Sequence, residues 1–396
     1  MPPAEVEPAA VVVIGGGFAG LNSALQLAAA PNPTPVVLLE PQERFLFLPL
    51  LYELLSGEMR RWEIAPRYQQ LLAGSGVVWL QERATRIHTS RKIVETSSGR
   101  ELPYKALVVA TGGRAETYGI PGVLEHALSF RSLEDVERLQ AVVQRLRERQ
   151  RPLQRLVVVG AGASGVELSC KLADLLQGAA IVEVIEQGAD LLPGSKAFNR
   201  DQARQALLKR DIRLRTNTSV IAVQAESLTL QRAGADAQHS EALSCDAVIW
   251  TGGLAGRVPD LNPLLPLDPR GRLICNSCLQ VIGADDLYAL GDAAACPFRD
   301  ADQASHPATA QVAYQQASCI SSNLKHQAHG EPLQAFNWND LGEMLGLGIG
   351  QASITGMGLT LAGAPAFQLR RLAYMARMPG LQQQLRVAGG WLATWL

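Results

Sequence analysis

Aromatic residues make up only 5% of this 396-residue chain, charged residues only 18%, and cysteine occurs just six times. Six cysteines in a chain of this length do not form a disulfide framework, and they suit a reducing compartment. The 36 Lys and Arg nearly balance the 37 Asp and Glu, so the net charge of −1 creates no field that attracts nucleic acid. No Lys or Arg precedes Arg44, which argues against a secretory or transit peptide.

The chain also lacks a long, uniformly apolar run. Residues 344–369 carry no charge and are numerous enough to cross a bilayer, but glycines and polar residues interrupt them throughout. Such a segment would leave poorly satisfied backbone groups in lipid. We therefore predict short strands and turns here, and no membrane span.

The chain does contain a repeated motif. Its residues are 47% hydrophobic, and its length is sufficient for two to three domains. Each copy has the order apolar strand, G-x-G-x-x-G and helix. The glycines are Gly15, Gly17 and Gly20 in the first copy, and Gly160, Gly162 and Gly165 in the second. In this motif the first glycine permits a tight turn, the second lets backbone approach a pyrophosphate, and the third lets helix and strand pack closely.

Two further landmarks recur at nearly constant offsets after each fingerprint. A second apolar strand ends in an acid, Glu40 or Glu186, which can accept hydrogen bonds from ribose hydroxyls. A third strand then closes on a glycine turn, at Gly112 or Gly252. Three matched landmarks make coincidence improbable, so we predict an α/β chain with two Rossmann-like dinucleotide-binding domains.

Residues 286–292 run as an apolar strand into Gly291 and Asp292, and here the chain resembles the two-dinucleotide-domain flavoprotein reductases. The resemblance implies FAD in the first copy, NAD(P)H in the second, and the flavin's ribityl chain at Asp292. It implies FAD contacts from Gly15, Gly17, Gly20, Glu40, Thr111, Gly112 and Asp292, and NAD(P)H contacts from Gly160, Gly162, Gly165, Glu186 and Gly252. The expected domains are 8–116 with 262–325 for FAD, 117–261 for NAD(P)H, and 326–396 as a C-terminal region.

Cysteine placement narrows the substrate class. Residues 41–56 contain no Cys, which excludes dithiol reductases and their single-Cys peroxidase relatives. Cys275 and Cys278 form a C-x-x-C, but no second pair or suitably spaced His completes a zinc site. We interpret them as ordinary strand and turn cysteines, and we predict no metal site.

Three segments, residues 44–67, 310–316 and 339–345, resemble the type II NAD(P)H:quinone oxidoreductases, also called alternative NAD(P)H dehydrogenases. The match covers nearly the whole chain and is greatest for the cyanobacterial and plastid branch that reduces demethylphylloquinone in vitamin K1 synthesis. Gln311 and Gln315 share a helix face, where two amides could bond quinone carbonyls. A solvated helix face is the alternative, but the family's A-Q-x-A-x-Q motif, matched here, favours quinone binding.

Glu167 follows the second fingerprint. A glutamate in the first turn of a helix is favourable to the helix dipole, while the family's matching Glu lies by the nicotinamide and flavin. Both readings stay open. The expected reaction passes hydride from NAD(P)H to FAD and then two electrons to a membrane naphthoquinone or plastoquinone. The alternatives are a sulfide:quinone oxidoreductase-like enzyme and a flavin-bearing interaction protein switched by NADH.

Glu186 predicts a preference for NADH, because a 2′-phosphate would meet a like charge and no adjacent Arg would bind it. This prediction conflicts with the vitamin K1 branch, which is associated with NADPH.

The C-terminal segment is basic. After Glu343 there is no Asp, Glu or Lys, only Arg370, Arg371, Arg377 and Arg386. Apolar residues flank these arginines at helical spacing; they are Phe367, Leu369, Leu372, Tyr374, Met375, Met378, Leu385, Val387, Trp391, Leu392, Trp395 and Leu396. Such helices suit the headgroup layer of an anionic leaflet. We expect peripheral attachment to the cytoplasmic face of a plasma or thylakoid membrane, and a homodimer. The alternative is that these helices pack on the FAD domain or on a dimer partner through the same apolar face.

Overall fold

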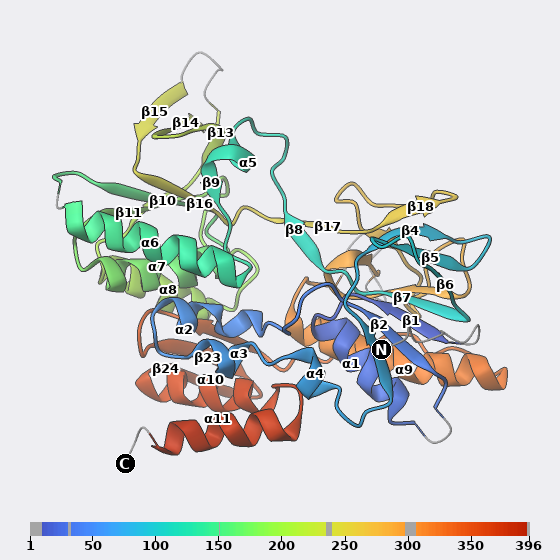
Figure 1. Ribbon diagram of the computed structural model, residues 1–396. Coiled ribbons are helices and arrows are strands. Elements are labelled where there is room, and N and C mark those ends of the chain that lie inside the picture. The colour runs from blue at the N-terminus through green and yellow to red at the C-terminus, as the bar shows by residue number, and fades with distance from the viewer. Residues whose placement is uncertain (1–9, 31–32, 150, 235–239, 298–305, 394–396) are drawn as a thin grey trace. The chain divides into compact units, whose positions relative to one another are not determined.

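The computed structural model describes residues 10–30, 33–149, 151–234, 240–297 and 306–393 (Figure 1). The chain forms two compact units. The first unit comprises Met1–Leu46, Ala65–Arg114 and Leu254–Asn339, and the second comprises Phe47–Ile64, Ala115–Gly253 and Asp340–Leu396.

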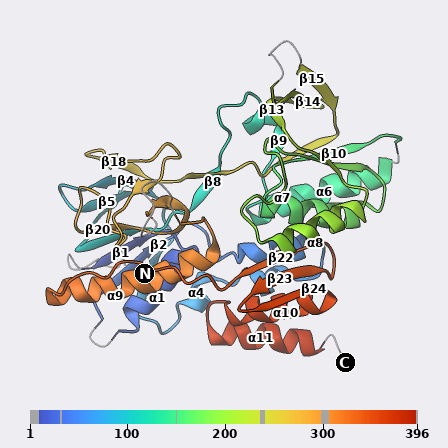
Figure 2. The ribbon, with the colours of Figure 1, turned by 180° about the vertical axis from the view of Figure 1, so that it is seen from behind.

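A five-stranded parallel sheet forms the centre of the first unit, with the order β20-β7-β1-β2-β3. Its strands are β1 (Val11–Ile14), β2 (Val36–Leu39), β3 (Val77–Leu80), β7 (Ala106–Val109) and β20 (Leu287–Ala289). The residues of β1, β2, β7 and β20 are buried almost completely, which is consistent with continuous apolar runs of Val, Leu, Ile and Ala, with Tyr288 in β20, that show no polar alternation. Helices α1 (Phe18–Ala28) and α9 (Ala310–His329) pack against each other beside this sheet (Figure 2).

Smaller elements complete the first unit. A four-stranded sheet contains β4 (Ala84–His88), β5 (Ile93–Thr96), β6 (Glu101–Pro103) and β18 (Asp260–Asn262). The short strands β19 (Leu273–Ile274) and β21 (Ala294–Ala295) pair in parallel, and the one-turn helix η2 (Gly291–Ala293) precedes β21. The remaining elements are α4 (Tyr68–Leu71), β17 (Leu254–Gly256) and β8 (Gly113–Ala115), the last of which ends at the first residue of the second unit.

The second unit repeats the plan, with a parallel sheet in the order β12-β11-β10-β16-β9. Its strands are β9 (Ala127–Leu128), β10 (Arg155–Val159), β11 (Ile181–Ile185), β12 (Arg213–Arg215) and β16 (Ala247–Trp250). Helices α5 (Val123–His126), α6 (Leu133–Arg149), α7 (Ala163–Leu176) and α8 (Ala197–Leu208) accompany it. An antiparallel meander of β13 (Thr218–Gln224), β14 (Ser227–Arg232) and β15 (Ser240–Ser244) shares a buried core with β10, β11 and β16.

The C-terminal part of the second unit is an antiparallel sheet followed by two helices. The elements are β22 (Glu343–Gly346), β23 (Ala352–Gly356), β24 (Leu359–Gly363), α10 (Ala364–Ala376) and α11 (Leu381–Ala393). The segment 47–64 adds η1 (Leu48–Leu50), α2 (Leu51–Leu55) and α3 (Arg61–Ile64). As predicted, residues 344–363 form strands and turns, but residues 364–369 begin helix α10, which the sequence prediction for this stretch did not include. Among the described residues no helix is long and apolar enough to cross a membrane.

The predicted fold class is confirmed, since both nucleotide-binding plans fold as parallel α/β sheets. The compact units divide the chain at other points than the expected domains. Residues 47–64 and 340–396 join the second unit, and residues 326–339 join the first. The assignment of each domain to one dinucleotide stays a prediction.

Candidate functional site

The first fingerprint lies between the end of β1 and the start of α1. Gly15 has φ +95°, and a Cβ there would lie 2.5 Å from the Ala110 carbonyl oxygen. A Cβ at Gly20 would lie 1.8 Å from the Gly15 carbonyl oxygen, so glycine lets the helix pack directly on the turn. At Gly17, by contrast, no described atom outside the adjacent residues lies within 4 Å of a Cβ position. This open backbone at the N-cap of α1 is what a pyrophosphate requires.

Glu40 stands at the end of β2, facing the same turn. Its carboxylate accepts hydrogen bonds from the Gly16 N–H at 2.7 Å and the Gln42 N–H at 2.8 Å. Burial raises the pKa of Glu40, and the two N–H donors partly offset this effect. The Tyr68 hydroxyl donates to the Gly16 carbonyl oxygen at 2.7 Å and thereby supports the turn. The carboxylate is therefore held beside the fingerprint, where it can meet a ribose.

The second fingerprint repeats this geometry in the second unit. Gly160 has φ +102°, and a Cβ at Gly165 would lie 1.9 Å from the Gly160 carbonyl oxygen. At Gly162 no described atom outside the adjacent residues lies within 4 Å of a Cβ position. Glu186 follows β11 and accepts from the Ala161 and Gly188 N–H groups, both at 2.7 Å. Gly160, Glu186 and Gly252 all line one cavity of about 70 Å³.

The closing glycine turns lie beside their fingerprints. A Cβ at Gly15 would approach the Thr111 Cα to 2.9 Å, and a Cβ at Gly160 would approach the Gly252 Cα to 3.2 Å. The Thr251 hydroxyl donates to the Val159 carbonyl oxygen at 2.7 Å, which ties the second turn to β10. Each unit thus brings together the glycines that the sequence repeat singled out.

Asp292 lies in η2, one residue after Gly291, which adopts φ +60°. A Cβ at Gly113 would lie 3.2 Å from the Asp292 Cβ, so Asp292 is next to the first closing turn. Gln316 of α9, which sequence reasoning missed, accepts the Gly291 N–H at 2.7 Å and is only 2% exposed. Ser321 and Asn323 are buried on the same helix, so nothing local in the sequence marks Gln316.

Gln311 and Gln315 both lie on α9 and are half-buried, as their spacing predicts. Their amides bond to the chain itself. Gln315 donates to the Asn339 carbonyl oxygen and accepts the Asn339 N–H, both at 2.9 Å. The Gln311 carbonyl oxygen accepts the indole N–H of Trp338 at 3.0 Å. The two amides therefore anchor residues 338–339, and their role toward a quinone stays a prediction.

Glu167 belongs to a buried ionic cluster in the second unit. Arg370 of α10 is 1% exposed and pairs with Glu53 of α2 and, at 3.2 Å, with Glu167 of α7. The Gly346 N–H donates to Glu167 at 2.5 Å. Burial raises the pKa of Glu167 to about 7, although Arg370 opposes the shift. Glu167 can thus gain or lose a proton near neutral pH, which a purely helix-stabilising glutamate does not require.

The expectation that Arg370 meets lipid headgroups is therefore wrong, because this side chain is the buried partner of two carboxylates. Lys171 of α7 is buried as well and pairs with Glu58, whose second oxygen accepts the Gly350 N–H at 2.9 Å. The Arg370–Glu53 pair joins the segment 47–64 to α10, and the Lys171–Glu58 pair joins it to α7. Sequence reasoning missed Glu53, Glu58 and Lys171, since nothing local marks a partner hundreds of residues away.

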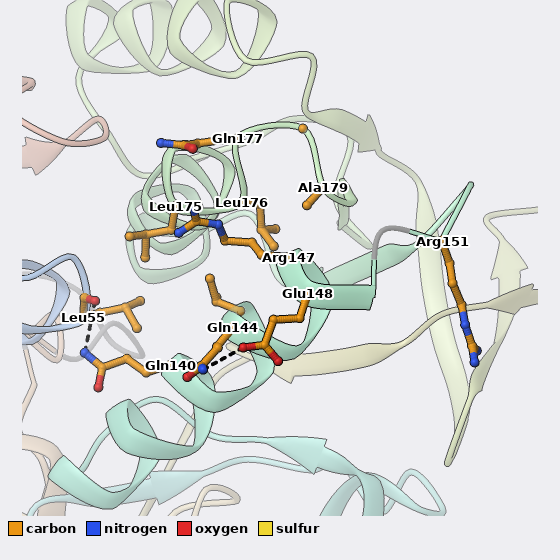
Figure 3. Close-up of a pocket in the computed structure, with 12 residues that line it drawn as sticks. Leu55, Gln140, Gln144, Arg147, Glu148, Arg151, Leu175, Leu176, Gln177 and Ala179 are labelled. Atoms are coloured by element: carbon orange, nitrogen blue, oxygen red, sulfur yellow. Dashed lines mark hydrogen bonds between the residues drawn. The ribbon is translucent and has the colours of Figure 1, made fainter.

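A cavity of about 1040 Å³ lies between α6 and the end of α7 in the second unit (Figure 3). Its lining includes Leu55, Gln140, Arg147 and Gln177, and none of the predicted site residues. Among the described residues no group of three or more His, Cys, Asp or Glu could hold a metal ion.

Residues 9–317 match the pyridine nucleotide-disulphide oxidoreductases. The chain belongs to this family. Demethylphylloquinone reductase NdbB of Synechocystis sp. is 38% identical over 96% of this chain and 95% of its own length. An alternative NAD(P)H-ubiquinone oxidoreductase of Arabidopsis thaliana is 33% identical over 97% of this chain and 80% of its own. These relatives confirm the resemblance to the type II NAD(P)H:quinone oxidoreductases.

Solved structures confirm the fold. NDH2 from Plasmodium falciparum, in complex with NADH, superposes with a TM-score of 0.86 at 19% identity, covering 98% of each chain. The sulfide:quinone oxidoreductase of Aquifex aeolicus superposes with a TM-score of 0.79 at 19% identity, covering 92% of this chain and 90% of its own. Because both are distant in sequence, they establish architecture and do not separate the two activities.

Proposed function

We propose that this protein is an FAD-dependent NAD(P)H:quinone oxidoreductase whose acceptor is a naphthoquinone of the demethylphylloquinone type. The observation that carries the proposal is the pair of open glycine turns, each with a carboxylate held beside it. Two such turns in one chain fit one resident and one exchanging dinucleotide. The quinone is inferred from the names of relatives such as the demethylphylloquinone reductase that is 38% identical to this chain.

The residues of each unit fit the dinucleotide that the family implies. Gly17 and Gly162 leave room for phosphates at helix N-termini, and two N–H donors hold each of Glu40 and Glu186 beside its fingerprint, where the carboxylate would accept ribose hydroxyls. When bound, FAD would supply the redox chemistry, namely accepting a hydride and giving up two electrons. The chain's own part is to orient both dinucleotides, and Glu167, in its buried cluster, can store a proton.

Glu186 sets the nucleotide preference. Its carboxylate is fixed beside the second fingerprint by Ala161 and Gly188, so a 2′-phosphate would be placed against a negative charge. NADH is therefore the expected donor, even though the naphthoquinone-reducing branch is associated with NADPH.

The C-terminal helices attach the protein to a membrane surface. Four leucines remain exposed on them, namely Leu369, Leu372, Leu381 and Leu385. Part of the expected apolar stripe packs inward instead, since Phe367, Met378 and Val387 are buried and the Trp391 indole donates to Glu63 at 3.0 Å. The side chain of Leu392, and Trp395 and Leu396, lie outside the described residues. Attachment through the four leucines and Arg377, on the cytoplasmic face and as a homodimer, completes the proposal.

The test is steady-state turnover of the purified holoprotein with NADH or NADPH and a matched pair of naphthoquinones, one methylated and one demethylated. We expect nucleotide oxidation to depend on quinone, with the higher kcat/KM for the demethylated acceptor. Sulfide as the donor is the control, because turnover with sulfide alone would favour a sulfide:quinone oxidoreductase. A rate of nucleotide oxidation that does not change when quinone is added would refute the proposal and favour an NADH-switched flavoprotein.

A further inference from the structure

Four of the six cysteines come together in the first unit, although they are widely separated along the chain. Cys275 directly follows β19, Cys278 lies in the next turn, Cys296 directly follows β21, and Cys319 lies on α9. All four are free thiols. The quinone reductase function proposed above uses none of them.

Two of these thiols are inside the unit. The Cys275 N–H donates to the Ala295 carbonyl oxygen at 3.0 Å, so Cys275 and Cys296 stand at the ends of the paired strands β19 and β21. Both are buried, and the Cys296 Sγ lies 3.6 Å from the Asn276 carbonyl oxygen. Burial raises the pKa of Cys296 to about 12. A protonated thiol without solvent access is a poor nucleophile, so this inner pair is not expected to react first.

The other two cysteines are partly exposed, and Asn323 contacts both residues, through the backbone of Cys278 and the thiol of Cys319. The Asn323 side-chain amide nitrogen lies 3.2 Å from the Cys278 carbonyl oxygen and 3.6 Å from the Cys319 Sγ. Asn323 thus joins the turn that carries Cys278 to the helix that carries Cys319. Burial raises the pKa of Cys319 to about 11, and the proximity of Cys278 adds to the shift. Cys278 is partly exposed in a turn and takes the attacking role, and Cys319 on α9 is the resolving thiol.

We propose that Cys278 and Cys319 form a dithiol that a hydroperoxide converts into a disulfide. With hydrogen peroxide, the Cys278 sulfur attacks one peroxide oxygen, the O–O bond breaks, and a sulfenic acid and one water form. The Cys319 sulfur then attacks the Cys278 sulfur, the S–S bond forms, and the hydroxyl leaves with the Cys319 proton as a second water. The two thiols lose two electrons, and the peroxide gains them.

The bridge would tie the turn at residues 276–280 to α9. Because it closes the long chain segment between residues 278 and 319, it restricts the unfolded state, and the oxidised protein should unfold at a higher temperature. The same helix carries Gln316, whose amide holds Gly291. Oxidation therefore rigidifies the support of the Gly291–Asp292 turn.

The experiment exposes the full-length, reduced holoprotein to hydrogen peroxide, blocks free thiols with N-ethylmaleimide, and maps linked peptides by non-reducing mass spectrometry. We expect a Cys278–Cys319 peptide that dithiothreitol removes, and a higher Tm after oxidation. Cys278→Ser and Cys319→Ser should abolish both changes. Cys245→Ser, a buried cysteine of the second unit, is the matched control and should retain both. A bridge between any other pair, or thiols that stay free under peroxide, would overturn the proposal.

Discussion

Several residues that support the candidate site are recognised by the burial of their side chains. Glu40 and Glu186 could be predicted from a strand ending in an acid, and the structure shows each one held by two backbone N–H donors. Glu53, Glu58, Lys171 and Gln316 could not be predicted, because their partners are distant in sequence and a buried charge has no local signature. These residues decide how the site responds to pH and to substitution.

The pKa of Glu167 predicts a pH-dependent stability. The folded-state pKa of about 7 exceeds that of an unfolded glutamate, so the unfolded state releases the proton first as the pH rises. Stability should therefore fall between about pH 4.5 and pH 7, by on the order of 3 kcal/mol, and stay level above pH 7. Urea unfolding across this range should show the decline in the wild type and not in Glu167→Gln. The exposed Glu226→Gln is the control and should behave as the wild type.

Removing the buried guanidinium group of Arg370 should lower the free energy of unfolding. Arg370→Met leaves Glu53 and Glu167 facing each other without a counter-charge, and we expect a loss of about 3–5 kcal/mol in the free energy of unfolding. Arg377→Met, on the exposed surface of the same chain segment, should change it by less than about 0.5 kcal/mol. Equal stability of the two variants in urea would contradict the arrangement of this cluster.

Nucleotide choice rests on Glu186. We expect the wild type to have a higher kcat/KM with NADH than with NADPH, because the carboxylate repels a 2′-phosphate. Glu186→Gln should narrow that difference by roughly tenfold while FAD stays bound, since an interaction of about 1.4 kcal/mol is at stake. A wild-type enzyme that prefers NADPH would show that other basic residues outweigh Glu186.

At the scale of elements, periodicity and glycine placement predicted the two strand–turn–helix units, because these depend on neighbours within about 30 residues. The C-terminal helices were predicted as well, but not which of their faces is buried. Arg370 and Phe367 turn inward, where the segment 47–64 supplies partners for Arg370, whereas Leu369 and Leu372 turn outward. A helical stripe indicates an apolar face without saying whether protein or lipid covers it.

Membrane attachment can be tested at these helices without deleting them. Truncation before α10 would remove Arg370 and so disturb the buried cluster, which makes side-chain replacement the sharper experiment. Replacing Leu369, Leu372, Leu381 and Leu385 by Gln should reduce binding to liposomes that contain anionic lipid, while FAD stays bound. Leu153→Gln with Leu208→Gln, exposed elsewhere in the second unit, is the control. Unchanged sedimentation of the four-leucine variant with liposomes would refute attachment through this face.

The turn after β19 gives a further prediction. Replacing Cys275 and Cys278 together by Ser should leave quinone turnover largely intact, because neither residue lies at a fingerprint or a closing turn. The measurement is kcat/KM with NADH and a naphthoquinone. Lost turnover in a folded, FAD-containing variant would mean that these thiols take part in the reaction.

At the scale of the molecule, sequence repeats predicted two nucleotide-binding plans, and the family comparison agrees. The extent of each compact unit was not predictable, because it depends on long-range pairs such as Glu53 with Arg370 and Glu58 with Lys171. Those pairs assign residues 47–64 to the second unit, in the middle of a stretch that otherwise belongs to the first.

This interleaving limits how such a protein can be changed by recombination. The chain passes between the two units after residues 46, 64, 114, 253 and 339, so neither unit corresponds to one continuous stretch of gene. A crossover that exchanges a whole nucleotide-binding unit between two relatives would need several simultaneous junctions, and a single junction could separate the partners of an ion pair such as Glu53 and Arg370. Donor and acceptor specificities are therefore expected to be inherited together and to diverge by point substitution, as at Glu186, rather than by the shuffling of modules.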